Sequence, residues 1–441
     1  MSNTNPQALV NDLTARAKDA GGEILNTVSG LLGKDSETQF VEIIIMMMIA
    51  IVVVLFVFWA YSLTSLQNAD CQRLDTIYQN TQGSASTRSI AKFNPAYNSD
   101  TSGVPQYSAI NYMFDPSGGM ARTFSYYVKT AYNCCSPGNF SNSFVSICAL
   151  KHAIALGARC LDFEIYSLDQ EPVISTSTQS TDLDSSFYIK ETFNSLKLAD
   201  ALYYIKYFAL ESSNDGAVNY LDPLYLHFRI MTQQPETIKL IAKYLVDILG
   251  DHLLGSEYGR NNHDTNNMSK ESILNFCGKC IIMVNSNNNN SNVISLSDLW
   301  TLVNISLAHD SSSLNRQYKY SDIRSMTDEA KTDLKTNNKY GMSIVIPDNN
   351  NSTANFDPRI CLKYGCQFIA MNFQTFDSNL ETYFSIFDEI GYSYRLKPFS
   401  LRYTAVHYLI DHKTIQHGVA CSSSVTKGGS RASSGALLPP S

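Results

Sequence analysis

Residues 354–376, ANFDPRICLKYGCQFIAMNFQTF, contain the last of five short apolar runs that decide the fold. Within this stretch, QFIAMNFQ at 367–374 has the length and composition of a buried strand, and amphipathic helical patterns such as that at 236–249 lie between the runs. The four earlier runs are CLDFEIY at 160–166, PLYLHFRI at 223–230, KCIIMVN at 279–285 and MSIVIP at 342–347. Repeated alternation of strand and helix predicts a parallel sheet, and a closed eight-fold barrel needs about 250 residues. We therefore predict an α/β domain of the TIM-barrel type at 121–412.

The composition narrows the class of protein. Hydrophobic residues make up 44% of the 441 residues and charged residues 17%, which allows a large core and excludes wholesale disorder. The chain carries 33 lysines and arginines against 40 aspartates and glutamates, without a basic block. A footprint for a phosphate backbone is missing, so nucleic acid is not expected as a partner. The ten cysteines lack the spacing of small secreted domains, and the redox compartment stays open.

The stretch IIIMMMIAIVVVLFVFWAYSL at 43–63 contains no charged residue. A helix of this length spans about 30 Å, the thickness of the hydrocarbon core of a bilayer. Trp59 lies near its end, where amphipathic rings favour the headgroup level. A buried core helix is usually shorter, and so is the apolar region of a signal peptide. We predict a single-pass transmembrane helix at 43–65; because Lys34 and Arg73 on its flanks nearly cancel, neither the side of the membrane nor the compartment is predicted.

Several segments are expected to lie outside the barrel. Residues 1–42 have an amphipathic pattern, which predicts either a surface or partner-binding helix or a partly helical, flexible tail. Residues 66–120 are rich in Ser, Thr, Asn and Gly and are predicted to form a spacer. The asparagine-rich run at 285–292 is predicted to be a polar loop, and residues 413–441 a flexible tail.

Five sequence motifs follow one another along the middle of the chain. They are GARCLDFEIYSLDQEPVIS at 157–175, PETIKLIAKYLVDILGDHLL at 235–254, CGKCIIMVN at 277–285, SLSDLW at 295–300, and ANFDPRICLKYGCQFIAMNFQTF at 354–376 with YSYRLKPFSLR at 392–402. In this order they resemble the catalytic barrel of eukaryotic phosphoinositide-specific phospholipase C, over about residues 124–403. The resemblance implies a (β/α)8 barrel with an X half at about 124–286, a Y half at about 316–405, and its site at the C-terminal ends of the strands.

The chemistry that the resemblance implies uses two histidines and a calcium ion, which help an inositol 2-hydroxyl attack the adjacent phosphate. Tyr132, in TAYN at 130–133, falls on the first histidine, and Thr178 falls on the second. A phenol with an ordinary pKa near 10 is a poor proton carrier at neutral pH, and a threonine hydroxyl cannot shuttle protons there. Neither position is expected to catalyse.

The calcium ligands that the resemblance implies are retained only in part. Asn133, Asp162 and Glu164 keep oxygen ligands, but Arg229 falls on the fourth position. Asp162 and Glu164 are two residues apart on a strand, so both face the barrel interior and need a cation or a proton. A guanidinium carries a permanent charge and binds carboxylates bidentately. We hypothesise that Arg229 occupies the place of calcium, the alternative being that it points elsewhere; no metal or other cofactor is expected.

The substrate positions that the resemblance implies are also changed. Met283 and Asn285 fall on two lysines of the family, so the phosphates of an inositol headgroup would lose cationic partners. Ser321 and Phe356 match a substrate-binding serine and an aromatic neighbour. Such side chains shape a pocket but do not drive hydrolysis.

Other reactive side chains give less specific signals. His227 shares the inward face of its strand with Arg229 and is interpreted as a core histidine. The CxxC motif at 277–280 has no second pair at zinc-ribbon distance. Buried structural cysteines are commoner than nucleophiles, which is the preferred interpretation of Cys134, Cys135 and Cys160. N-glycosylation sequons, which an asparagine-rich chain also yields by chance, begin at Asn139, Asn267, Asn304 and Asn351.

These observations predict a membrane-anchored phospholipase C-like protein that does not hydrolyse phosphoinositides and acts as a binding or structural scaffold at a membrane or virion. Its expected partners are the lipid bilayer, through residues 43–65, and a protein of unknown identity. The alternative is a divergent phosphoric diester hydrolase that would depend on calcium and use Tyr132, His227 or a cysteine in unfamiliar roles.

Overall fold

The computed structural model describes two parts of the chain, a long N-terminal helix and the domain that follows it. The described residues are 36–79, 88–93, 114–115, 119–120, 122–178, 188–213, 216–259, 268, 271–285, 291–308, 313–348 and 350–403, with a few between 15 and 23. The segment predicted at 1–42, the second half of the predicted spacer and the loop at 285–292 therefore lie largely outside the described residues, and the tail at 413–441 lies wholly outside them.

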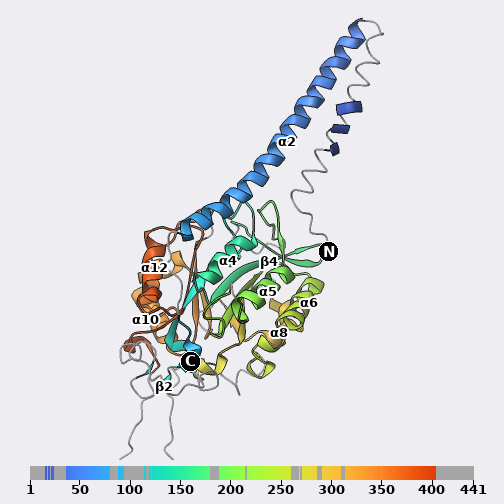
Figure 1. Ribbon diagram of the computed structural model, residues 1–441. Helices are drawn as coiled ribbons and strands as arrows, with labels where there is room; N and C mark the ends of the chain where they lie inside the picture. Colours follow the sequence, from blue (N-terminus) through green and yellow to red (C-terminus); the bar gives the residue numbers. More distant parts are fainter. Residues whose placement is uncertain are drawn as a thin grey trace, which may run out of the picture.

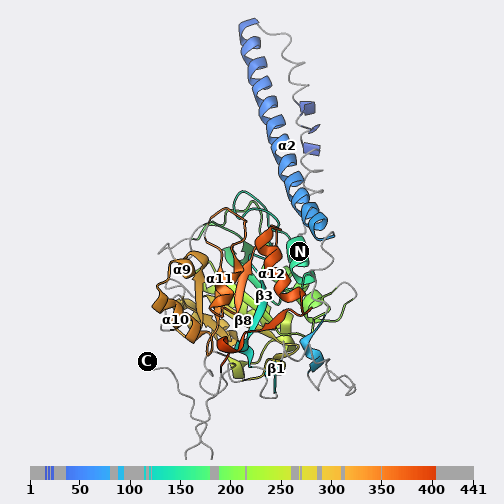
Figure 2. The same cartoon turned by 90° about the vertical axis from the view of Figure 1, so that its left-hand side faces the viewer.

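Eight parallel strands form a barrel, which confirms the predicted TIM-barrel fold (Figures 1 and 2). Around the barrel, each strand pairs in parallel with the next in the order β10-β11-β12-β3-β4-β7-β8-β9. A single parallel bridge between Ala308 and Arg316 joins β9 to β10 and closes the ring. The strands are β3 (Tyr126–Ala131), β4 (Cys160–Leu168), β7 (Leu224–Ile230), β8 (Cys280–Asn285), β9 (Ile305–Leu307), β10 (Arg316–Lys319), β11 (Ser343–Ile346) and β12 (Phe368–Met371).

Helices cover the outside of the barrel in the segments between the strands (Figures 1 and 2). The pattern at 236–249 corresponds to α6 and its π-helical continuation η4. The helices are α4 (Ile147–Ala155), α5 (Leu198–Ile205) with η3 (Lys206–Leu210), α6 (Pro235–Tyr244) with η4 (Leu245–Leu249), α7 (Ser291–Ser295), α8 (Leu299–Leu302), α9 (Tyr320–Ser325), α10 (Asp328–Asn337), α11 (Pro358–Lys363) and α12 (Ser378–Asp388).

Short elements complete the domain. β5 (Glu171–Ser175) pairs antiparallel with the end of β4 and with β6 (Leu196–Lys197), and β13 (Tyr394–Leu396) runs antiparallel to β3. The remaining short elements are η1 (Ile90–Phe93), η2 (Thr123–Ser125), η5 (Gly250–His252), η6 (Ser256–Tyr258), η9 (Ile273–Phe276), η10 (Phe399–Leu401), β1 (Phe114–Asp115) and β2 (Gly119–Met120).

Alternation along the strands divides the apolar side chains between two cores. In β4, Leu161, Phe163 and Ile165 belong to the outer core beneath the helices, whereas Cys160 belongs to the second core inside the barrel. Successive side chains of a strand point to opposite faces, so residues 162 and 164 share the inward face with Cys160. This alternation places the charged side chains of Asp162 and Glu164 inside the barrel.

The N-terminal helix α2 (Ser36–Gln79) is longer than the predicted span and extends into the segment predicted as a spacer. Polar residues after position 65 suggested a spacer, but one face of this end docks on the barrel. Leu74 and Tyr78 are buried, and the Tyr78 hydroxyl donates a hydrogen bond to the Phe373 carbonyl. A disulfide between Cys71 and Cys148 links α2 covalently to α4.

The apolar part of α2 projects away from the barrel, as Figure 1 shows, with its side chains open to the surroundings. Val52 is 64% exposed and Phe58 is 69% exposed. Within the described residues, α2 is the one helix long and apolar enough to cross a membrane.

Candidate functional site

The four positions that match the calcium ligands meet at the C-terminal ends of β3, β4 and β7; they are Asn133, Asp162, Glu164 and Arg229. The parallel register of β4 and β7 sets Glu164 directly beside Arg229. Asn133 follows the end of β3 with a φ of 40°, a left-handed conformation that asparagine tolerates better than most residues. This turn brings the Asn133 backbone N–H to 3.0 Å from Asp162 Oδ1. The Arg229 side chain was expected either to point between the carboxylates or to point elsewhere. In the structure the guanidinium points between them.

Arg229 makes hydrogen bonds to three side chains through all of its nitrogens. Nε and Nη2 donate to the two carboxylate oxygens of Asp162 at 3.0 and 2.7 Å, a bidentate pairing. Nη1 donates to Glu164 Oε1 at 2.6 Å, and Nη2 also donates to Asn133 Oδ1 at 2.7 Å. The side chain is 1% exposed. The guanidinium therefore fills the space between the two carboxylates.

The one carboxylate oxygen of this pair that Arg229 leaves open, Glu164 Oε2, is held by other donors. Glu164 Oε2 accepts hydrogen bonds from the Tyr166 hydroxyl at 2.7 Å and from the Ser177 backbone at 3.0 Å. Since each carboxylate oxygen already has a donor, a calcium ion would have to displace Arg229 to find ligands. Within the described part of the chain, no group of three or more His, Cys, Asp or Glu side chains converges on a metal site. The residues present do not fit calcium.

The charges of this cluster stabilise one another. Burial by itself would raise the pKa of Asp162, but the Arg229 charge and the nearby His227 outweigh it, and the pKa of Asp162 lies below its usual range. Burial likewise opposes the charge on Arg229, yet Asp162, Tyr132 and Glu164 together raise the pKa of the guanidinium well above its usual value. Both members of the pair are therefore favoured in their charged forms.

The two residues that match the family histidines, Tyr132 and Thr178, make structural contacts. The Tyr132 ring lies under the Arg229 guanidinium, 4.5 Å from ring centroid to carbon, a cation–π geometry. Burial raises the pKa of Tyr132 above its already high value, so this phenol cannot accept a proton near neutrality. Thr178 donates from its backbone and hydroxyl to Glu191 Oε2 at 2.8 and 2.6 Å.

The other candidate nucleophiles and bases are buried. His227 is fully buried, with Nδ1 2.7 Å from Asp162 Oδ2 but without the alignment of a hydrogen bond. Desolvation by burial raises the pKa values of the Cys134 and Cys160 thiols well above normal, and it also raises that of Cys135. A thiolate is the reactive form of cysteine, so these side chains are inert at neutral pH.

The substrate-pocket positions are divided between the core and the barrel mouth. Met283 is completely buried in the barrel interior, and Asn285 is buried at the end of β8. Phe356 stacks on Tyr320 with ring centroids 4.5 Å apart. Ser321 is exposed at the start of α9, where its backbone N–H donates to Asp348 at 2.9 Å.

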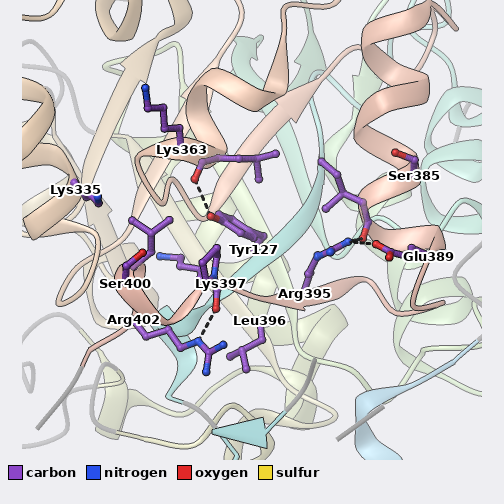
Figure 3. Close-up of a pocket in the computed structure, with 14 residues that line it drawn as sticks. Tyr127, Lys335, Lys363, Ser385, Glu389, Arg395, Leu396, Lys397, Ser400 and Arg402 are labelled. Atoms are coloured by element: carbon purple, nitrogen blue, oxygen red, sulfur yellow. Dashed lines mark hydrogen bonds and ion pairs between the residues drawn. The ribbon is translucent and has the colours of Figure 1, made fainter. Parts of the chain in front are cut away.

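The cavity beside the matched positions is small, and a much larger one lies away from them. A cavity beside Tyr132 and Asn133 has a volume of about 10 Å³, room for one water at most. A cavity of about 780 Å³ lies outside the barrel, between α11, α12 and β13, where helices return to the starts of the strands (Figure 3). Basic side chains, among them Lys397 and Arg402, line it, with Glu389 as its one carboxylate.

Several contacts at the site were not predicted. Tyr166 has the same strand parity as Glu164, so the i, i+2 rule could have placed it there. Ser177 and Glu191 reach the site through the β4–β5 hairpin and the segment after it, which the sequence pattern does not pair. The Cys71–Cys148 disulfide joins residues 77 positions apart, and no local spacing indicates it.

Comparisons with known proteins agree with this architecture. Residues 302–400 match the Y domain of phosphatidylinositol-specific phospholipase C. The structure is similar to PLC21 of L. pealei, with 18% identity and a TM-score of 0.50, over 64% of this chain and 38% of that one. It is also similar to PLC21 of S. officinalis, with 18% identity and a TM-score of 0.51, over 66% and 40% of the two chains. The chain thus covers well under half of either protein, and no curated protein matches it.

Proposed function

We propose that this chain, which carries a phosphoinositide-specific phospholipase C-like catalytic barrel, is a membrane-anchored binding or structural scaffold that does not hydrolyse phosphoinositides. The observation that carries the proposal is the position of Arg229 between Asp162 and Glu164. The resemblance implies that the related enzymes bind a calcium ion between carboxylates at these positions. A fixed guanidinium neutralises the carboxylates without offering an open coordination position to a substrate phosphate.

The proton chemistry is missing as well. General acid–base catalysis needs a group whose pKa lies near the working pH. Tyr132 has a raised pKa, and Thr178 is committed to Glu191. The replacement of both lysine positions by Met283 and Asn285 removes charges that would hold phosphates. The cluster stabilises the fold but has no group suited to activate a hydroxyl.

The helix α2 supports the anchoring part of the proposal. Its exposed apolar surface would be costly in water, and its charge-free stretch at 43–63 is long enough to span the hydrocarbon core of a bilayer. Its docked end holds the barrel to the anchor by the disulfide and by an Arg73 hydrogen bond to the Pro137 carbonyl at 2.7 Å. A barrel held in this way presents its outer surface to a protein partner at a membrane or virion.

The competing function is a divergent phosphoric diester hydrolase. It would require Tyr132, His227 or a buried cysteine to reach a substrate. The described cavity that Tyr132 and Cys134 line has a volume of only about 10 Å³, too small for an inositol headgroup. The scaffold function therefore explains more of the site.

Turnover of phosphatidylinositol tests the proposal. The purified, detergent-solubilised chain is mixed with vesicles that contain phosphatidylinositol, in calcium or in chelator, and released inositol phosphate is measured. We expect no turnover above that of a Tyr132→Ala, Thr178→Ala variant. Calcium-dependent turnover that this variant lacks would establish the hydrolase instead.

A further inference from the structure

We propose that the barrel lies on the oxidising, exoplasmic side of the membrane and carries N-linked glycans at Asn139 and Asn351. The inference rests on the proposed membrane anchor, but it is independent of whether the barrel hydrolyses lipids. It assigns a side of the membrane that the sequence alone leaves open.

The first observation is the disulfide between Cys71 and Cys148. Disulfides form and persist in oxidising compartments and are rare where glutathione keeps thiols reduced. This one joins the end of the membrane helix to α4 of the barrel, so both partners lie on the same side of the bilayer. The flanking charges do not oppose this orientation, since Lys34 and Arg73 nearly balance.

The distribution of the other cysteines agrees with an oxidising surrounding. The seven further cysteines that the structure describes are all buried, and only the Cys71–Cys148 pair is partly exposed. An exposed free thiol would be open to unwanted pairing in such a compartment. Along the described residues, the accessible sulfur atoms are the ones already joined.

The second observation is the exposure of two sequons. Asn139 and Asn351, each followed at the second position by Ser or Thr, are exposed. Asn351 Oδ1 accepts a hydrogen bond from the Ser141 backbone at 3.2 Å, so the two sequons are neighbours on one face of the barrel mouth. Glycans need an exposed acceptor asparagine, because the attached sugar must extend into solvent.

The sequon at Asn304 provides an internal contrast. Its asparagine is 5% exposed, and its side chain accepts a hydrogen bond from the Ile282 backbone at 2.9 Å and donates one to the Tyr258 carbonyl at 3.3 Å. A sugar on this amide nitrogen would remove the second of these contacts and would have to fit into the core. We therefore expect Asn304 to stay unmodified.

The test expresses the full chain in cells with a secretory pathway. Alkaline carbonate extraction first establishes whether the protein is membrane-embedded. Electrophoretic mobility is then compared before and after enzymatic removal of N-glycans, for the wild-type chain, Asn139→Gln and the double variant Asn350→Gln, Asn351→Gln. The double variant is needed because Asn350 begins an overlapping sequon that would survive Asn351→Gln alone. Ser306→Ala, which abolishes the third sequon without touching Asn304, is the matched control. Thiols are counted by alkylation of the unfolded protein with and without reduction.

The expected result is one glycan step lost in Asn139→Gln, one lost in the Asn350→Gln, Asn351→Gln variant and none lost in the control, with two thiols that label only after reduction. The sequon at Asn267 lies outside the described residues, and none of these variants alters it. A membrane-embedded chain without glycans would overturn the inference even if the disulfide were present, because oxidation would then occur on the cytosolic side. A chain that carbonate extracts would instead refute the anchor. Neither outcome depends on phospholipase activity, so the two proposals fail separately.

Discussion

Replacing Arg229 by methionine tests the role of the buried cluster most simply. The variant keeps much of the side-chain volume but leaves Asp162 and Glu164 close together without a cation. Four hydrogen bonds disappear, all to buried acceptors. Removing one partner of a buried ion pair costs about 3–5 kcal/mol, because an uncompensated charge stays behind.

The expected loss of unfolding free energy can be measured as a fall in melting temperature. For a domain of this size, 1 kcal/mol corresponds to about 2–4 °C, so the variant should melt roughly 6–20 °C below the wild type. Circular dichroism of the solubilised chain follows the transition. Protonation of one carboxylate would relieve the repulsion, and the deficit should therefore shrink as the pH falls toward the pKa that the two carboxylates share in the variant.

Arg316 is the matched control. It is also a buried arginine paired with a carboxylate, at 2.6 Å from Asp333, but that aspartate is largely exposed. Screening by water limits such a pair to about 1 kcal/mol or less. If Arg229→Met melts no lower than Arg316→Met, the cluster does not have the energetic role assigned to it.

Further predictions concern calcium, pH and the disulfide. Arg229→Glu should gain a calcium-dependent rise in melting temperature, worth about 2.7 kcal/mol at a hundred times its dissociation constant, which the wild type lacks. Burial raises the pKa of Asp222 to about 6, so between pH 3.8 and pH 6 the folded chain keeps a proton that the unfolded chain has lost. The free energy of unfolding should therefore fall by about 3 kcal/mol as the pH rises through that window. Asp222→Asn should remove this dependence on pH. Burial lowers the pKa of Lys129 to about 8, so between pH 8 and pH 10.5 only the unfolded chain holds this proton. The free energy of unfolding should therefore rise with pH across that range, and Lys129→Met should remove the rise in the same assay. Cys71→Ser should lower the free energy of unfolding by about 4 kcal/mol, because the disulfide closes a loop between residues 77 positions apart. Cys135→Ser is the control; it should show only the smaller effect of replacing a buried free thiol.

The strands that could be predicted are those with continuous apolar runs. β7, β8, β11 and β12 lie within four of the five predicted runs, and β4 begins with the remaining run and extends two residues past its end. β3 was not recognised because Lys129 interrupts its pattern, although that lysine is fully buried beside Asp388 at 3.3 Å. β10 reads as polar in RQYK, and β9 has three residues, too few for a periodic signal. Tertiary pairing, rather than local pattern, makes these three segments strands.

The site was predictable as far as strand parity reaches. Two carboxylates at positions i and i+2 of one strand must lie on the same face, so the sequence predicted that both point into the barrel, together with an arginine from another strand. The sequence could not show that β4 and β7 are neighbours in a register that pairs Glu164 with Arg229. Nor could it show the docking of α2, since Leu74 and Tyr78 are buried against residues far along the chain.

Calcium binding by the unmodified chain tests the central claim most directly. Thermal unfolding is recorded in millimolar calcium and in chelator, alongside a structure determined from crystals grown in calcium. The account predicts identical melting curves, with Arg229 still bridging Asp162 and Glu164. A higher melting temperature in calcium, with the ion bound between those carboxylates and Arg229 displaced, would contradict it.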